Sequence, residues 1–352
     1  MTTAVGAVEP QWQNNTPPEL SSYYGSIGTY SFSTYDQGLT WYGSIVGQNY
    51  PPVIIPSNLF GERGLLGGAD SAGALGMLIE YITISTPSNG TTFGNLTVSR
   101  EGTAATSDAS RGVWAGGNDF GPGGGLIGAV DTIDYITIAT PGNATDFGNL
   151  TAVQEALREG AASNGSRGVF GGGQDSNNPV NIIHYITIAT TGNATDFGDL
   201  TSTRRGSAAN GDGVRGVFGG GYMNSKVNTI DYITIATTGN ATDFGDLVQV
   251  SDNMGACSDG SRGLWAGGGS LTLIQSVTIS TTSNAVTFGN LTEWRRYLGA
   301  TSNGSRGVFL GGISATGSRG VIDYVTISTP SDASNFGDLT QYRRDGSATS
   351  GD

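Results

Sequence analysis

The side chains that most often carry catalysis and metal binding are rare in this chain. Its 352 residues include one histidine, His184, and one cysteine, Cys257. Zinc sites combine several His and Cys ligands, and Ser-His-Asp or Cys-His catalysis needs a histidine beside the nucleophile. We therefore expect no catalytic residues, no metal site and no cofactor, and we predict that the protein is not an enzyme.

Arginine and aromatic residues, by contrast, occur close together at several points of the chain. Aromatic faces stack on sugar rings or partner side chains, and the planar guanidinium group pairs with carboxylates or sulfates. These residues indicate binding rather than catalysis. The predicted binding face comprises Trp294, Arg295, Tyr297, Tyr342, Arg343, Arg204, Tyr222 and Phe120.

The overall charge limits the class of partner. The net charge is −13, with 16 basic residues against 29 acidic ones. Nucleic-acid binding needs a basic patch, and an anionic membrane surface attracts basic segments. No apolar run reaches the 18 or more residues of a membrane-spanning helix. We expect neither a nucleic-acid partner nor membrane insertion.

A three-part repeat organises most of the chain. Its first part, Arg-Gly-Val-Phe-Gly-Gly-Gly or a close variant, begins at Arg63, Arg111, Arg167, Arg215, Arg262 and Arg306. Its second part, typified by Asp-Tyr-Ile-Thr-Ile, is centred on Tyr81, Tyr135, Tyr185, Tyr232, Ser276 and Tyr324. Its third part, Phe-Gly-Asn/Asp-Leu, begins at Phe93, Phe147, Phe197, Phe244, Phe288 and Phe336.

Each repeat predicts four short strands. In the third copy these are residues 160–163, 168–170, 182–189 and 197–200, separated by Gly- and Asn-rich turns. Helical periodicity occurs only near residues 153–157. Four strands in every copy are typical of the blade of a β-propeller.

The chain ends predict how the ring closes. Residues 346–352 match a first strand and turn, whereas the repeat that begins at Arg63 lacks its own first strand. Pairing the two would complete a blade and leave no open sheet edge. The predicted fold is therefore all-β: a six-bladed β-propeller over residues 58–352, with four-stranded blades and the C-terminal strand closing the first blade.

These repeats resemble kelch-type, galactose-oxidase-like propeller repeats in their Gly-Gly strand and their Asp-Tyr-Ile-Thr-Ile strand. They depart from kelch because Phe-Gly-Asp-Leu replaces the usual tryptophan of the fourth strand. Galactose oxidase activity is excluded because its copper site needs two histidines. Gly-rich repeats with Ser-Asn-Gly-Ser-Arg-Gly turns are most similar to repeat proteins of marine tailed-phage virions. That resemblance implies a virion structural protein at the tail or outer surface of the particle.

Comparison of the six copies predicts one constant and one variable face. The connections between the second and third strands, and those between the fourth strand and the next first strand, vary most and should emerge together. The binding residues above lie in these connections. Among the arginines there, we expect Arg295 and Arg343 to bind ligand, and Arg100, Arg158, Arg205, Arg296 and Arg344 to bridge blades.

Three further predictions concern structural residues. The six Arg-Gly arginines should tie the fold together, with Asp134, Asp231 and Asp323 as partners. His184 occupies the position of these acids in the third repeat, so we interpret it as a blade residue. Cys257 should be a buried thiol.

Residues 1–57 belong to no repeat and form the predicted N-terminal arm. Within them, residues 34–41 read Thr-Tyr-Asp-Gln-Gly-Leu-Thr-Trp and resemble the Asp-box of sialidases, a hairpin turn. A hairpin of residues 30–33 with 41–45 is expected. The remaining arm has too few aliphatic residues for a core of its own. We predict that it anchors the protein to other virion structural proteins through Trp12, Tyr23 and Tyr24.

The sequence thus favours a non-enzymatic virion protein whose propeller face binds a host glycan or a neighbouring structural protein. The alternative is a free carbohydrate-binding lectin or adhesin. A glycan-cleaving enzyme is a weaker third reading, because no pair of convergent carboxylates is identifiable on the variable face.

Overall fold

The computed structural model describes residues 29–34, 41–46, 59–69, 74–121, 125–175 and 178–352. The chain divides into two units, Met1–Ile54 and Ile55–Asp352, close to the predicted boundary after residue 57. In the first unit β1 (Thr29–Thr34) pairs antiparallel with β2 (Trp41–Val46). Thr34 lies opposite Trp41, so the hairpin predicted from the Asp-box resemblance is confirmed.

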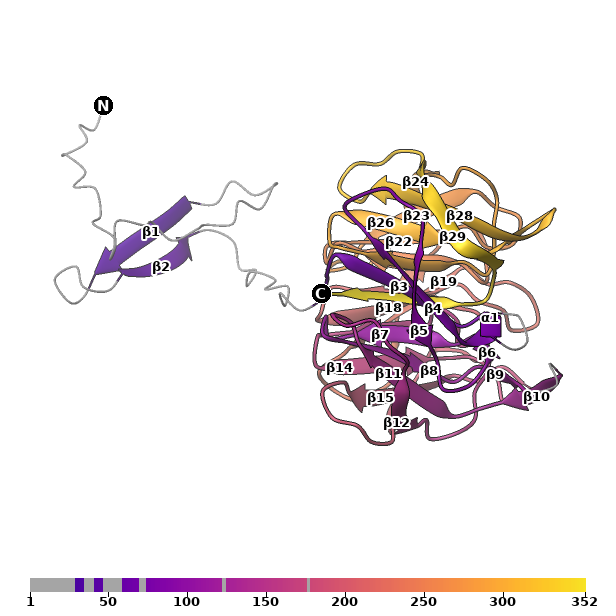
Figure 1. Ribbon diagram of the computed structural model, residues 1–352. Helices are drawn as coiled ribbons and strands as arrows, with labels where there is room; N and C mark the ends of the chain where they lie inside the picture. The colour runs from indigo at the N-terminus through magenta and orange to yellow at the C-terminus, as the bar shows by residue number, and fades with distance from the viewer. Residues whose placement is uncertain (1–28, 35–40, 47–58, 70–73, 122–124, 176–177) are drawn as a thin grey trace, which may run out of the picture. The chain divides into compact units, whose positions relative to one another are not determined.

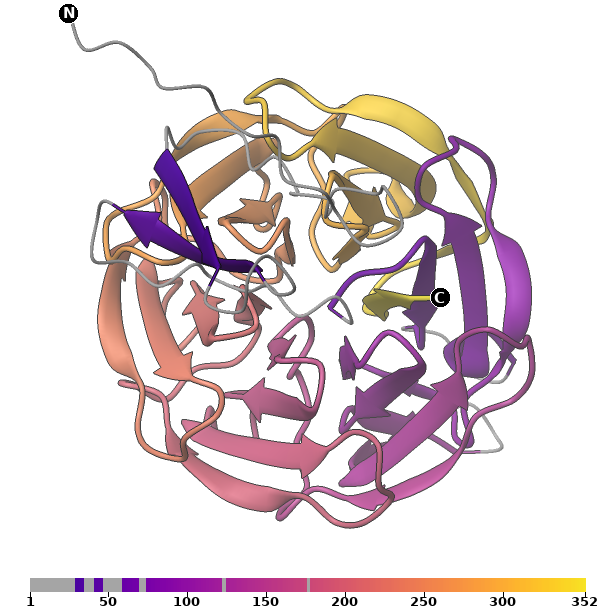
Figure 2. The same ribbon diagram turned by 90° about the vertical axis from the view of Figure 1, so that its left-hand side faces the viewer.

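The second unit is built from antiparallel sheets, and its described residues contain one helical turn, α1 (Ala74–Met77). Five sheets have four strands and another has five. Figure 2 shows them following one another in chain order around a common centre. This is the all-β, propeller-like architecture that the repeats predict.

We number the sheets along the chain and give their strands in hydrogen-bonded order. The first sheet is β30 (Ser347–Gly351), β3 (Arg63–Gly67), β4 (Leu78–Thr83) and β5 (Thr91–Asn95). The second is β7 (Ala104–Ser107), β8 (Arg111–Ala115), β11 (Thr132–Thr137) and β12 (Thr145–Asn149). The third is β13 (Ala161–Ser163), β14 (Arg167–Gly171), β15 (Ile182–Thr187) and β16 (Thr195–Asp199).

The later sheets repeat this order. The fourth is β17 (Ala208–Gly211), β18 (Arg215–Gly219), β19 (Thr229–Thr234) and β20 (Thr242–Asp246). The fifth is β21 (Gly255–Ser258), β22 (Arg262–Ala266), β23 (Leu273–Thr278) and β24 (Val286–Asn290). The sixth is β25 (Gly299–Ser302), β26 (Arg306–Leu310), β28 (Gly317–Thr326) and β29 (Ser334–Arg343), with β27 (Ile313–Ser314) beside β28.

The strands of the third repeat lie where its sequence predicts them, within one or two residues at most of their ends. The helix suggested by the periodicity of residues 153–157 is absent, and this suggestion was wrong. That segment has no regular secondary structure apart from a single bridge at Glu155, and Ala156 and the nearby Arg158 have positive φ angles of 53° and 51°. A left-handed backbone interrupts any helix, because right-handed helices need negative φ at every residue.

The Arg-Gly arginines tie each sheet to the next, as predicted, but through other partners. Each guanidinium donates to an isoleucine carbonyl of the following sheet at 2.6–3.2 Å. Each also lies over an aromatic ring of its own sheet, at 4.3–5.8 Å from the ring centroid. The prediction that they pair with Asp134, Asp231 and Asp323 was wrong, because other arginines occupy those carboxylates.

The glycine after each of these arginines makes room for a neighbouring sheet. A Cβ atom on Gly168 would lie 2.7 Å from the Thr106 side chain, and one on Gly307 would lie 2.7 Å from Cys257 Sγ. Any larger residue there would push adjacent sheets apart. The buried Cys257 thiol fills such a contact, which confirms the prediction that it is buried.

Candidate binding face

The variable connections of neighbouring strands pair with one another. β6 (Arg100–Glu101) pairs with β9 (Asn118–Phe120), which also pairs with β10 (Leu126–Ala129). Single bridges join Glu155 to Gln174, Arg205 to Tyr222 and Arg296 to Ile313. Both variable sets therefore lie on one face, as predicted, and Figure 1 shows it at the end that carries α1, β9 and β10.

A buried ion pair supports this face in four of the six sheets. The arginine precedes the innermost strand, and the acid lies on the third strand of the same sheet. The nitrogen-to-oxygen distances are 2.7–3.1 Å, and both side chains of each pair are at most 1% exposed. The pairs are Arg100–Asp134, Arg204–Asp231, Arg295–Asp323 and Arg343–Glu80.

The sixth sheet illustrates how such a pair is satisfied. Arg295 donates to Asp323 and to the carbonyls of Gly311 and Val321, each at 2.7 Å. Asp323 accepts further bonds from the Thr292 amide at 3.1 Å and hydroxyl at 2.7 Å. Burial lowers the pKa of the Arg295 guanidinium, and the Asp323 charge opposes that effect. The pair and the Thr292 bonds thus fasten the segment between β24 and β25, which carries Arg295, to β28, which carries Asp323.

The other two sheets replace both members of the pair at once. In the third sheet, Gln154 and His184 take the two places, and His184 Nε2 lies 2.6 Å from Gln154 Oε1. His184 Nδ1 lies 2.8 Å from the Thr151 hydroxyl, so the neutral ring with a proton on Nε2 satisfies both contacts. Burial lowers the pKa of His184 to about 4. In the fifth sheet, Gln275 replaces the acid and Ser251 replaces the arginine.

These contacts correct the predicted site. Arg204, Arg295 and Arg343 are 0–2% exposed and ion-paired, so the prediction that they face a ligand was wrong. The expectation for Arg100, that it is structural, agrees with its burial. The arginines that follow the buried ones, Arg205, Arg296 and Arg344, are half-buried, and Arg205 donates to Gln174 of the preceding sheet's connection, in line with the expected bridging role.

The buried arginines and the arginines that follow them differ in burial because side chains alternate between two sides along an extended chain. Where an arginine at one position points inward, the residues before and after it point outward. The outward position after the buried residue therefore recurs in all six sheets on a similar backbone. Its occupants, from the second sheet to the first, are Glu101, Glu155, Arg205, Asp252, Arg296 and Arg344; Asp252 is buried and the other five are half-buried.

The predicted aromatic residues are distributed around this face. Tyr222 lies under the Arg205 guanidinium at 5.2 Å, and Arg205 also donates to Gln174. Phe120 and Trp294 are half-buried, while Tyr342 is 71% exposed. The structure thus keeps these four aromatic residues as surface candidates but spreads them over several sheets.

Tyr297 lies at the centre of the face. Its ring is flanked by Arg158 at 4.4 Å and Arg296 at 5.0 Å. Arg158 also pairs with Asp345 at 2.8 Å and donates to Asn253, so it joins residues that come from three other sheets. The expectation that Arg158 bridges blades is therefore confirmed. The sequence did not identify its partners, although two extra residues between Gln154 and Ser163 distinguish this repeat.

A ring of backbone hydrogen bonds surrounds this centre. Its members have positive φ angles, and each N–H donates to the preceding sheet's carbonyl at 2.8–3.1 Å. Gly102, Gly206 and Asn253 suit the left-handed region, whereas an aromatic residue at φ 59°, as at Tyr297, is unusual there. The donor–acceptor pairs are Gly102–Asp345, Asp345–Tyr297, Tyr297–Asn253, Asn253–Gly206, Gly206–Ala156 and Arg158–Gly102.

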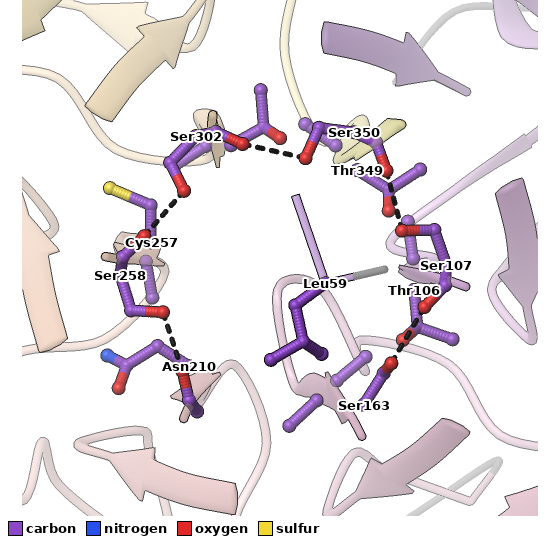
Figure 3. Close-up of a pocket in the computed structure, with 18 of the residues that line it drawn as sticks. Leu59, Thr106, Ser107, Ser163, Asn210, Cys257, Ser258, Ser302, Thr349 and Ser350 are labelled. Carbon is purple, nitrogen blue, oxygen red and sulfur yellow. Dashed lines mark hydrogen bonds between the residues drawn. The ribbon is translucent and has the colours of Figure 1, made fainter. Parts of the chain in front are cut away.

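A cavity of about 110 Å³ lies at the opposite end of the innermost strands. Figure 3 shows serine hydroxyls around it, which donate to carbonyls of neighbouring strands at 2.5–2.7 Å, and the Leu59 side chain pointing between them. Glu159 is buried deeper and accepts the Ala348 amide at 3.0 Å. Burial raises the pKa of Glu159 well above its ordinary value. The lining hydroxyls bond to the fold itself, so we assign no ligand to this cavity.

The predicted anchor residues Trp12, Tyr23 and Tyr24 lie outside the described residues. Across the described part of the chain, no three His, Cys, Asp or Glu side chains gather as metal ligands. No helix in that part is long and apolar enough to cross a membrane. No protein-family model and no curated protein matches this chain.

Proposed function

We propose that the second unit is a closed, six-bladed β-propeller. Its support is that contacts found between consecutive sheets also join the sixth sheet to the first. Arg306 donates to Ile84 O at 2.9 Å, and the Asp338 amide donates to Asn89 Oδ1 at 3.0 Å. β30 pairs with β3 over five residues, from Arg63 opposite Gly351 to Gly67 opposite Ser347. Closure of this kind removes the exposed sheet edges that invite aggregation.

The variable face of this propeller serves as a recognition surface. The observation that carries this proposal is the outward position beside the buried pairs. The same single bridge forms there whether the outward residue is Glu155, Arg205 or Arg296. The fold accepts either charge at this position, so the choice of side chain is available for binding a partner.

The partner is a host glycan or a neighbouring structural protein, and the protein is a non-enzymatic component of a tailed-phage particle. The resemblance of the Gly-rich repeats to virion proteins supports this assignment, as does an arm of 57 residues without a repeat. The arm would dock on other virion proteins at the tail or outer surface and hold the propeller there.

Selective blocking of the two faces tests the recognition surface. Asn224→Cys places an exposed thiol in a variable connection, and Thr238→Cys places one in a turn of the constant face. The buried Cys257 should not react, so maleimide-polyethylene glycol would label each variant at one site. Both conjugates are then compared on an array of bacterial surface polysaccharides and on particles that lack the protein.

We expect the Asn224 conjugate to lose binding and the Thr238 conjugate to keep it. Loss on the array identifies a glycan partner, and loss on particles alone identifies a structural neighbour. Equal binding by the two conjugates in both assays would contradict a variable-face site.

A further inference from the structure

The residues that flank the buried arginine differ between sheets in whether they combine an aromatic residue with a second arginine. In the sixth sheet they are Trp294 and Arg296, and in the first they are Tyr342 and Arg344. Alternation along the extended segment places each aromatic residue on the same side as its arginine. The corresponding residues in the other sheets are Ser99/Glu101, Val153/Glu155, Thr203/Arg205 and Val250/Asp252, of which Ser99 and Asp252 are buried. An aromatic residue together with an arginine therefore occurs in two sheets, which are neighbours.

Each of these pairs presents usable surface. Tyr342 packs against the Gly320 backbone, where a Cβ atom would lie 2.9 Å from the Tyr342 ring, yet the side chain remains 71% exposed. Trp294 is half-buried. An aromatic residue supported from below and open above offers a flat face to a sugar ring.

The guanidinium of Arg296 is held in place but not neutralised. It stacks on Tyr297 at 5.0 Å, and no carboxylate pairs with it among residues 59–352 that the structure describes. The two neighbouring carboxylates are already paired, Asp323 with Arg295 at 2.7 Å and Glu293 with Arg319 at 2.9 Å. A stacked guanidinium that keeps its donors free is suited to bidentate recognition of an anion.

Tyr297 places an aromatic ring at a position that is left-handed in every sheet. Its φ is 59°, and the equivalent Gly102, Ala156, Gly206, Asn253 and Asp345 have φ angles of 53–65°. A left-handed backbone is unfavourable for an aromatic residue and tends to persist where it serves a site. Here it presents the Tyr297 ring to the Arg296 guanidinium.

We propose that Trp294, Arg296, Tyr342 and Arg344 bind an anionic saccharide, with the aromatic faces against the sugar ring and the arginines on its carboxylate or sulfate. The acids Glu101 and Glu155 lie at the corresponding positions of the second and third sheets and disfavour an anion there. This inference rests on the proposed recognition function and names the ligand class of the same face.

Binding of the full chain to three defined polymers tests the proposal. Polygalacturonate supplies carboxylates, dextran sulfate supplies sulfates, and dextran supplies neither. In calorimetric titrations we expect at least one polyanion to bind and dextran not to bind. A net charge of −13 opposes nonspecific polyanion binding, so an interaction requires a local site.

Matched variants locate the site. Arg296→Gln and Tyr342→Ala should each weaken polyanion binding about tenfold. Arg205→Gln alters the same backbone position in a sheet where Thr203 replaces the aromatic residue, and it should change affinity less than about twofold. Unchanged thermal unfolding of each variant shows that the fold is intact, and Arg296→Lys should recover part of the affinity.

Three results would overturn the saccharide site: equal binding of dextran, no binding of either polyanion, or equal losses in Arg205→Gln and Arg296→Gln. None of them would overturn the recognition face itself. That face fails separately, if conjugates at residues 224 and 238 bind equally well on the array and on particles.

Discussion

We predict that the buried Arg295–Asp323 pair can be replaced by the glutamine and histidine that occupy the same two positions in the third sheet. The third sheet places Gln154 and His184 in the same two positions, and Thr151 there corresponds to Thr292 in the sixth sheet. The double variant Arg295→Gln/Asp323→His should therefore fold well. Either single substitution leaves one buried charge without its partner.

The expected magnitudes follow from burial. Both side chains are 0% exposed, and loss of one partner from such a pair costs roughly 3–5 kcal/mol. For a domain of this size, that loss lowers the melting temperature by roughly 5–15 °C. The double variant loses bonds to Gly311 and Val321 but buries no charge. It should recover at least about 2 kcal/mol relative to the sum of the single effects.

Thermal and urea unfolding of the four proteins at pH 7, followed by circular dichroism, measures this coupling. Asp323→His alone should be destabilised like Arg295→Gln alone. Strict additivity, with the double variant as unstable as the two losses combined, would refute our explanation of why the chain replaces both residues together.

Other expected outcomes concern the buried groups Glu159, Arg158 and Cys257. Glu159→Gln should stabilise the protein at pH 7: the raised pKa means that folding favours the protonated form, so this group's stabilisation is lost as pH rises above about 4.5. Urea unfolding between pH 4.5 and 8 should show a flatter profile for the variant than for the parent. Arg158→Ala removes the partner of Asp345, which is 6% exposed, and should cost about 2–3 kcal/mol; Arg158→Lys is the control, and an unchanged melting temperature would contradict the crossing contact. The Cys257 thiol, whose pKa burial raises, should react with Ellman's reagent only at the rate of unfolding, and rapid reaction of the native protein would show that the sheet interface is open.

Much of the fold follows from local sequence. Alternating β-branched residues such as Ile182–Thr187 and paired glycines recur at fixed spacing, so the strands of each sheet could be predicted with small errors at their ends. The pairing of β30 with β3 could also be predicted, because a first strand is missing from one end of the repeats and present at the other.

The site was harder to predict, because adjacent arginines differ by one residue and alternation sends them to opposite sides. In Arg295–Arg296 and Arg343–Arg344, composition does not tell which member is buried. Spacing does: the buried arginine precedes an equivalent serine of the innermost strand by seven positions, as in Arg100 to Ser107, Arg295 to Ser302 and Arg343 to Ser350. The contact of Arg158 with Asp345 and Asn253 depends on two extra residues in one repeat, whose spacing marks the insertion but does not identify the partners.

The two sides of this segment vary under different physical constraints. Inside, a charged arginine requires an acid, so the two residues are exchanged together, as Gln154 with His184 shows. Outside, Glu155 and Arg296 carry opposite charges on the same bridged backbone, so solvent and any bound partner decide between them. In these repeats a buried residue can change only together with its partner, whereas a residue on the outer side can change alone. The concentration of Trp294, Arg296, Tyr342 and Arg344 in two adjacent sheets is therefore not required by folding, and the anionic saccharide that we propose as ligand would account for it.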